Sequence, residues 1–198
     1  MKTTLRFLQQ ENARLQEENQ RLQDELGLLR DYLKALSALE NAADRLSSEQ
    51  EFFPLLHKIL YYALSLLDAT DGTLALLDRE TKELVFAVVR GAIEDDLVDF
   101  RMPQGEGIMG WVATHGKPSL VNEVDQDWRF SPRVDMLFGF DTQSMLCVPM
   151  KIDSLILGVI AVVNKHSGAD FGEIDQTLLS ILARAAAVAL SGFDEGAE

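Results

Sequence analysis

The stretch GEGIMGWVATHG, at positions 105–116, spaces three glycines in the pattern G-x-G-x-x-G. In a dinucleotide-binding unit, this pattern directly follows a central strand and opens a long crossover helix. Neither flank fits here, because Pro103 lacks the N–H that a central strand must donate. Gly116, which ends the stretch, and Pro118 after it limit the helix to about Ile108–His115, roughly two turns. The stretch instead predicts a tight turn into a short helix, in which Gly110 lets the helix sit close to a sheet.

Residues 5–36 carry the strongest periodic signal, an apolar seven-residue repeat. Leucine at every d position and asparagine at two a positions predict a coiled coil over more than four heptads. A buried Asn pairs with its mate across a parallel two-stranded coil, so we expect a parallel homodimer formed by residues 1–46. The alternative is an amphipathic helix that packs on its own domain. The residues expected at the seam are Leu8, Asn12, Leu15, Asn19, Leu22, Leu26, Leu29, Leu33 and Leu36.

The net charge of the chain is −14, and residues 1–36 carry equal numbers of basic and acidic side chains, so the acidic excess lies beyond them. An acidic globular part disfavours DNA, RNA and anionic membranes as partners. The single cysteine, Cys147, allows no internal disulfide, which fits a reducing cytoplasm. No apolar run reaches the roughly 18 residues of a membrane-spanning helix. We therefore expect a cytoplasmic protein without nucleic-acid or membrane partners.

The part after the heptads, residues 49–192, orders its apolar runs in a way that predicts an α+β fold. One helix extends to about Leu67, and another is expected at 172–191. Strands are expected at 73–78, 83–90, 119–122, 143–151 and 155–164. Because strands follow strands rather than alternate with helices, the sheet is expected to be antiparallel. Residues 91–104 are expected to be irregular, and 193–198 to form a disordered acidic tail.

The glycine stretch, followed by G-x-P, resembles the centre of a GAF domain, a small sensor fold of bacterial and eukaryotic signalling proteins. Further similar segments follow in the family's order, and the resemblance covers roughly residues 49–190. These segments are Val121–Val124, Asp127–Phe130, Ser144–Pro149 and Leu157–Lys165. Phosphodiesterase and cyclase members also carry N-K, then F, then D-E. Here the motif departs at its last residue, Gln176, and is otherwise present as Asn164, Lys165, Phe171 and Asp175.

The resemblance implies a six-stranded antiparallel sheet with helices on both faces. The first and last helices would lie on one face and form the dimer surface. The helix at Ile108 and the segment 123–142 would cover the other face and enclose a ligand pocket. In family members, this pocket holds cyclic nucleotides, tetrapyrroles or other small molecules. The candidate lining residues are Met109, Asn122, Asp125, Arg129, Phe130, Phe138, Thr142 and Ser144.

Two interpretations of these features stay open. The aromatic residues Phe130 and Phe138 either line a pocket or simply fill the space as core. An ion pair between Lys165 and Asp175 either closes the loop before the last helix over the pocket or only stabilises the fold. The motif makes a cyclic nucleotide a candidate ligand and leaves the cofactor otherwise unassigned.

Catalysis is the competing class of function. One branch of the GAF family reduces free methionine sulfoxide with several cysteines. Cys147 stands alone in a predicted core strand, where a buried thiol is unreactive. The histidines are scattered along the sequence, and no Ser-His-Asp set or metal-ligand cluster is evident. We therefore expect no enzymatic activity and no metal site.

The sequence thus predicts a homodimeric signalling module whose GAF domain binds a small molecule or a partner protein and relays its state through the coiled coil. The strongest competitor is a dimerisation scaffold whose pocket is filled by its own side chains. A cavity lined by Arg129 or Thr142 would favour the sensor. An interior filled by aromatic side chains would favour the scaffold.

Overall fold

The computed structural model describes residues 49–195 and, ahead of them, residues 11–12, 14–16, 18–20 and 23. Three residues of the predicted seam fall in this described part and are helical and exposed: Asn12, Leu15 and Asn19. The others lie outside the described residues: Leu8, Leu22, Leu26, Leu29, Leu33 and Leu36. The parallel coiled coil therefore stays a prediction.

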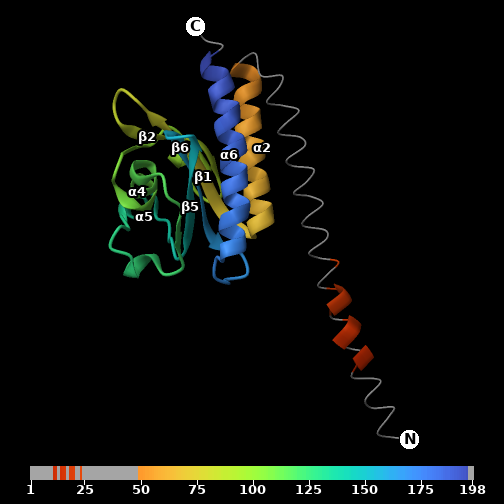
Figure 1. Cartoon of the computed structure of the whole chain (residues 1–198). Coiled ribbons are helices and arrows are strands. Elements are labelled where there is room, and N and C mark those ends of the chain that lie inside the picture. The colour runs from red at the N-terminus through yellow and green to blue at the C-terminus, as the bar shows by residue number, and fades with distance from the viewer. Residues whose placement is uncertain (1–10, 13, 17, 21–22, 24–48, 196–198) are drawn as a thin grey trace, which may run out of the picture.

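Six antiparallel strands form one sheet in the order β3-β2-β1-β6-β5-β4 (Figure 1). This arrangement confirms the predicted α+β class and the antiparallel sheet. The central strands β1 and β6 are the longest, and the short strands β3 and β4 form the edges. Pro103, which has no N–H to donate, is tolerated in β3 because β3 is an edge strand with a neighbouring strand on one side only. The strands are β1 (Ala69–Asp78), β2 (Glu83–Arg90), β3 (Arg101–Pro103), β4 (Ser119–Val121), β5 (Met145–Ile152) and β6 (Leu155–Lys165).

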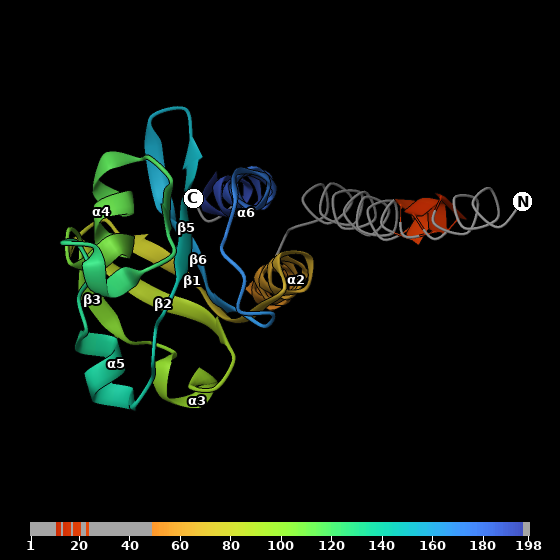
Figure 2. The ribbon, with the colours of Figure 1, turned by 90° about the horizontal axis from the view of Figure 1, so that it is seen from below.

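Helices α2 (Glu49–Leu67) and α6 (Glu173–Glu195) pack side by side on one face of the sheet and run in opposite directions (Figures 1 and 2). Both present an apolar side to the sheet. Leu60 of α2 and Leu182 of α6 are fully buried there, against residues such as Leu74 of β1. The expected position of the first and last helices is confirmed.

Helix α6 departs from expectation at its end. It continues to Glu195, so the expected tail is helical over 193–195, and residues 196–198 lie outside the described residues. By length and composition, its stretch Glu173–Ser191 could also cross a membrane. Core helices of soluble proteins can be equally long and apolar, and the inner side of α6 packs on the sheet. The length and composition of α6 are therefore weak evidence for a membrane span.

Short elements cover the opposite face of the sheet: α4 (Gly107–His115), a 3-10 turn at Val124–Gln126, and α5 (Arg133–Phe138). Figure 2 shows them across the sheet from α2 and α6. Another short helix, α3 (Glu94–Leu97), follows β2. The expected layer of a short helix and the segment 123–142 on this face is confirmed.

Two other regions also differ from the sequence expectations. Strand β1 begins at Ala69 rather than at residue 73, because its first residues pair with the end of β6, where Asp71 lies opposite Val163. The region 91–104, expected to be irregular, contains α3 and β3. Both are too short to show a hydrophobic period.

A β-bulge shifts the alternation of side chains in β2. Ala75 of β1 lies opposite Phe86, whereas Leu74 lies opposite Val88, so Ala87 is an extra residue. Phe86 faces the short helices, while Val88 faces α2 and α6. Without the bulge, a period of two would put Phe86 and Val88 on the same face.

Candidate ligand-binding cavity

A cavity lies between the sheet and α4 and α5, with about 80 Å³ available to the centres of water molecules. Its floor includes Phe86 and Val89 of β2 and Ala161 of β6, and its roof includes Met109 of α4 and Val134 of α5. Most of the wall is apolar. Because water finds few partners in such a space, the cavity suits the apolar part of a small molecule.

The glycine stretch builds the start of the roof. Gly105 and Gly107 have φ angles of 99° and 68°, a region that side chains rarely allow. A Cβ on Gly110 would lie 2.7 Å from the backbone N of Gly105, so Gly110 lets the turn, rather than the sheet, pack against α4. The helix ends at Gly116, in the left-handed conformation. The predicted turn into a short helix is confirmed, with this change in what Gly110 contacts.

Two carboxylates hold the cover, which we define as α4, α5 and the chain between them. Glu106 accepts hydrogen bonds from Ser131 Oγ (3.2 Å) and Arg133 Nη1 (3.1 Å), which ties α4 to α5. Asp135 accepts hydrogen bonds from the backbone N (2.9 Å) and Oγ1 (2.8 Å) of Thr142, which ties α5 to the chain entering β5. Polar contacts of this kind exchange readily with water, because water replaces each partner at a small net cost.

Three of the predicted lining residues do line this cavity: Met109, Phe130 and Thr142. Arg129, expected beside Thr142, does not. Its Nε donates a hydrogen bond to Asp127 at 2.8 Å, and its guanidinium lies 4.6 Å from the centre of the Trp111 ring. The side-chain hydrogen bonds between Arg129 and Asp127 lower the pKa of Asp127 below its usual range and raise the pKa of Arg129. The pair fixes the loop rather than facing the cavity.

Asn122 and Ser144 also lie outside the cavity lining. Asn122 donates a hydrogen bond to the backbone O of Phe171 (3.1 Å) and accepts one from the backbone N of the same residue (2.8 Å). The backbone N of Ser144 donates a hydrogen bond to Asn164 Oδ1 at 3.2 Å. Both contacts join neighbouring segments of the fold.

The last two predicted lining residues, Asp125 and Phe138, do not face the cavity either. Asp125 is exposed in the 3-10 turn. The ring of Phe138 packs edge-on against Phe100, with 5.5 Å between the ring centres, and Phe100 packs in the same way on Phe86 at 5.6 Å. This row of aromatic rings fills space beside the cavity.

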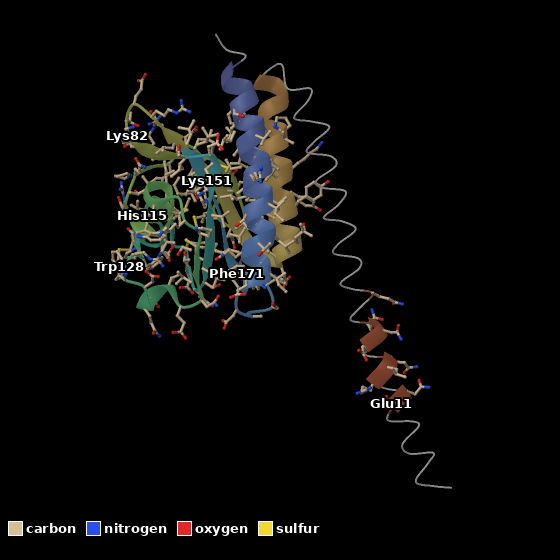
Figure 3. The ribbon with its side chains drawn as sticks, viewed as in Figure 1. Glu11, Lys82, His115, Trp128, Lys151 and Phe171 are labelled. Carbon is tan, nitrogen blue, oxygen red and sulfur yellow. The ribbon has the colours of Figure 1, made fainter. Side chains whose placement is uncertain are left out.

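The expected ion pair is present, with 2.7 Å between Lys165 Nζ and Asp175 Oδ2. Asp175 also accepts a hydrogen bond from the backbone N of Gly172, which caps the start of α6. Phe171 is buried in the core under α2 and α6. Figure 3 shows it at the base of α6, away from His115 and Trp128 of the cover. The four motif residues do not line the cavity.

Several lining residues were not singled out from the sequence, including Asp71, Thr73, Arg90, Ser131 and Asp135. Asp71 and Arg90 stand at the facing ends of β1 and β2. The sequence signal that could have pointed to Asp71 and Arg90 is a charged residue at the end of each of two apolar runs that pair as strands.

Cys147 belongs to the apolar core of the cavity face and is fully buried in β5. Burial raises the pKa of its thiol well above the usual range, which keeps it in the unreactive protonated form. Among the residues that the structure describes, no group of three His, Cys, Asp or Glu side chains could hold a metal ion.

The chain belongs to the GAF domain family, whose family model matches residues 54–191. A curated relative, the dual 3',5'-cyclic-AMP and -GMP phosphodiesterase 11 of Drosophila melanogaster, is 33% identical over 147 residues. The dual phosphodiesterase 11A of Takifugu rubripes is 32% identical over 156 residues. The matched parts are 67% and 74% of this chain, but only 10% and 17% of the relatives' lengths. The similarity therefore concerns one part of much longer proteins.

Several solved structures share the fold. The GAF domain of a phosphoenolpyruvate-protein phosphotransferase from Coxiella burnetii has a TM-score of 0.70 and 19% identity, and covers 82% of this chain and 94% of its own. The free methionine-R-sulfoxide reductase of Neisseria meningitidis has a TM-score of 0.64 and 21% identity, and covers 83% and 92%. At these identities the similarity establishes the fold alone.

Proposed function

We propose that this chain is a signalling module that senses a small molecule, with a cyclic nucleotide as the leading candidate. The observation that carries the proposal is an apolar cavity under a cover that two carboxylates tie down. The relatives named as dual cyclic-AMP and -GMP phosphodiesterases support the choice of ligand. A partner protein that docks on the cover is the other kind of input that this module would accept.

Ligand entry requires the cover to move. The cavity, at about 80 Å³, is smaller than the roughly 300–1,000 Å³ typical of small-molecule sites. The bonds of Glu106 and Asp135 are the contacts that must rearrange. We expect the sheet beneath to keep its hydrogen bonds while the cover moves.

In this proposal the signal leaves through a cytoplasmic homodimer. The outer sides of α2 and α6 expose Tyr61, Ile181 and Val188 by 52%, 36% and 48%. A second copy on this surface would remove apolar area from water, which favours association. The predicted coiled coil, residues 1–46, precedes α2 in the sequence, so we expect a shift of α2 to be passed on to it.

Isothermal titration of the full chain with cyclic AMP and cyclic GMP tests the ligand, and native mass spectrometry of the same sample reports the dimer. Ala161→Leu places a larger side chain on the cavity floor and should weaken binding at least tenfold. Ala169→Leu adds the same side chain to an exposed loop and should change nothing. Native protein that binds neither nucleotide at millimolar concentration would refute the proposed ligand.

A dimerisation scaffold is the second candidate. The aromatic row of Phe86, Phe100 and Phe138 already fills the space beside the cavity, which favours it. A dimer that binds neither cyclic nucleotide, and whose stability Ala161→Leu raises, would support the scaffold.

A further inference from the structure

Arg90 borders both the cavity and a groove beside α2. It is the last residue of β2, and it lines the cavity together with Asp71 and Ile93. On the other side it lines the groove, together with Tyr61 of α2. After the bulge at Ala87, Arg90 shares the face of Val88, towards α2, while its place at the end of β2 also brings it to the border of the cavity.

The guanidinium of Arg90 has an unused donor. Its Cζ lies 5.6 Å from the centre of the Tyr61 ring, and its Nε is buried without a hydrogen-bond partner. Within the part of the chain that the structure describes, it forms no ion pair, whereas Arg101, Arg129 and Arg133 each pair with a carboxylate. A buried donor without a partner costs free energy until an acceptor reaches it.

Other polar groups of the cavity are already engaged. Thr73 Oγ1 donates to the backbone O of Val88 at 3.0 Å. Ser131 and Thr142 donate to the carboxylates of the cover. Asp71 accepts a hydrogen bond from the backbone N of Ala92 at 2.6 Å. Arg90 is therefore the residue with which this cavity can meet an anionic group.

We propose that Arg90 is the anion-recognition residue of the cavity and binds the cyclic phosphate of a cyclic nucleotide. This inference rests on the proposed function. A guanidinium pairs well with phosphate oxygens because its N–H groups form a planar fork. To reach the phosphate oxygens, the Arg90 side chain leaves the ring of Tyr61. Tyr61 of α2 then loses its contact with the guanidinium.

The charges around Arg90 also select the kind of phosphate. Asp71 lines the cavity beside it, and Glu94 lines the groove. A cyclic phosphodiester carries one negative charge, whereas a 5'-monophosphate carries about −1.5 to −2 at neutral pH. Because two carboxylates lie beside the one guanidinium, a phosphate with a single negative charge is repelled less than one with two. The site therefore discriminates against linear nucleotides.

Isothermal titration with cyclic AMP and cyclic GMP, the 5'-monophosphates and the nucleosides tests the inference. Native protein should bind the cyclic form about 10- to 100-fold more tightly than the nucleoside, as expected for a charged hydrogen bond. Arg90→Gln should remove that difference, and Arg90→Lys should keep part of it. Arg184→Gln, which removes an exposed arginine of α6, should behave as native.

The outcomes separate the two proposals. If Arg90→Gln keeps the difference between cyclic nucleotide and nucleoside, Arg90 does not bind the phosphate, while the proposed function stands. If the native chain binds neither cyclic nucleotide, both fail. Should Arg90→Gln not fold, arginine Nε resonances of the native protein decide, with Arg90 assigned from the spectrum of Arg90→Lys. The Arg90 signal must shift with the cyclic nucleotide and not with the nucleoside, and an unshifted signal overturns the inference.

Discussion

On one face of the sheet, helices of 19 and 23 residues pack as a continuous apolar layer, whereas on the other, helices of 9 and 6 residues roof a cavity. The long helices offer an apolar stripe to the sheet over several turns, and residues such as Leu60 and Leu182 are fully buried. The short helices are placed by glycines and held by carboxylates. The comparison indicates that the helix face supplies stability and so lets the cavity face keep a hollow.

The largest expected effect separates the two faces directly. Leu60→Ala, on the helix face, should lower the free energy of unfolding by about 2–5 kcal/mol, because it opens a void in a filled core. Met109→Ala, in the cavity roof, should cost about 2 kcal/mol or less, because part of its side chain already faces empty space. Urea unfolding of both variants gives the comparison. Equal losses would show that the cavity face is as closely packed as the helix face.

A second test asks how closely the cavity cover is fitted. Gly110→Ala should destabilise the protein by about 3 kcal/mol, because the new Cβ would lie within 2.8 Å of backbone atoms of Gly105. Gly172→Ala is the control, since the atom nearest to its new Cβ would be Asp175 Oδ2, at an ordinary contact distance of 3.9 Å. Thermal unfolding measures both changes. A tolerated Gly110→Ala would mean that the turn before α4 is loosely held.

The ion pair at the start of α6 belongs to the helix face in this comparison. Its side chains are 14% and 15% exposed, so Lys165→Met should cost about 1–2 kcal/mol, between the values for exposed and buried pairs. Asp175→Asn keeps an acceptor for Gly172 and completes a double-mutant cycle. Affinity for a cavity ligand should not change. A loss of affinity at unchanged stability would instead assign the pair to the binding site.

The smallest effect concerns the hairpin that joins β1 and β2. The backbone N–H of Thr81 and the guanidinium of Arg101 lower the pKa of Asp78 from 3.8 to about 2. Because the folded-state pKa is the lower one, the stabilisation is present above about pH 4 and lost as the pH falls towards 2. Asp78→Asn should therefore differ from native in thermal stability near neutral pH and converge with it at about pH 2. A difference that persists at that pH would contradict this assignment.

The sequence predicted those parts of the fold whose periodic runs are long. The strands around Leu74 and Ile160 follow from the alternation of apolar residues, and helices α2 and α6 follow from a helical period. Helix α4 followed from its glycines. Elements of 3 and 4 residues, β3 and α3, carry too few side chains to define a period. The early start of β1 depends on pairing with β6, which is not encoded locally.

The cavity was predicted less well, because a sequence gives a polar residue but not its partner. Arg129 was expected in the cavity and pairs with Asp127 two residues away, while Asn122 bonds to the distant backbone of Phe171. Arg90 was missed because nothing in its local sequence shows that the end of β2 borders both the cavity and the groove beside α2. Thr142 was found because the family resemblance located the cover, not because of its own spacing.

The antiparallel arrangement of α2 and α6 has a mechanical consequence. Figure 1 shows that α2 begins and α6 ends at the same end of the domain. A pulling force applied at those two points would peel the helices from the sheet turn by turn, rather than shear the hydrogen-bonded strands against one another. Under tension, the domain would thus yield first on the face that contributes most to its thermal stability, while the hollow and its roof keep their shape.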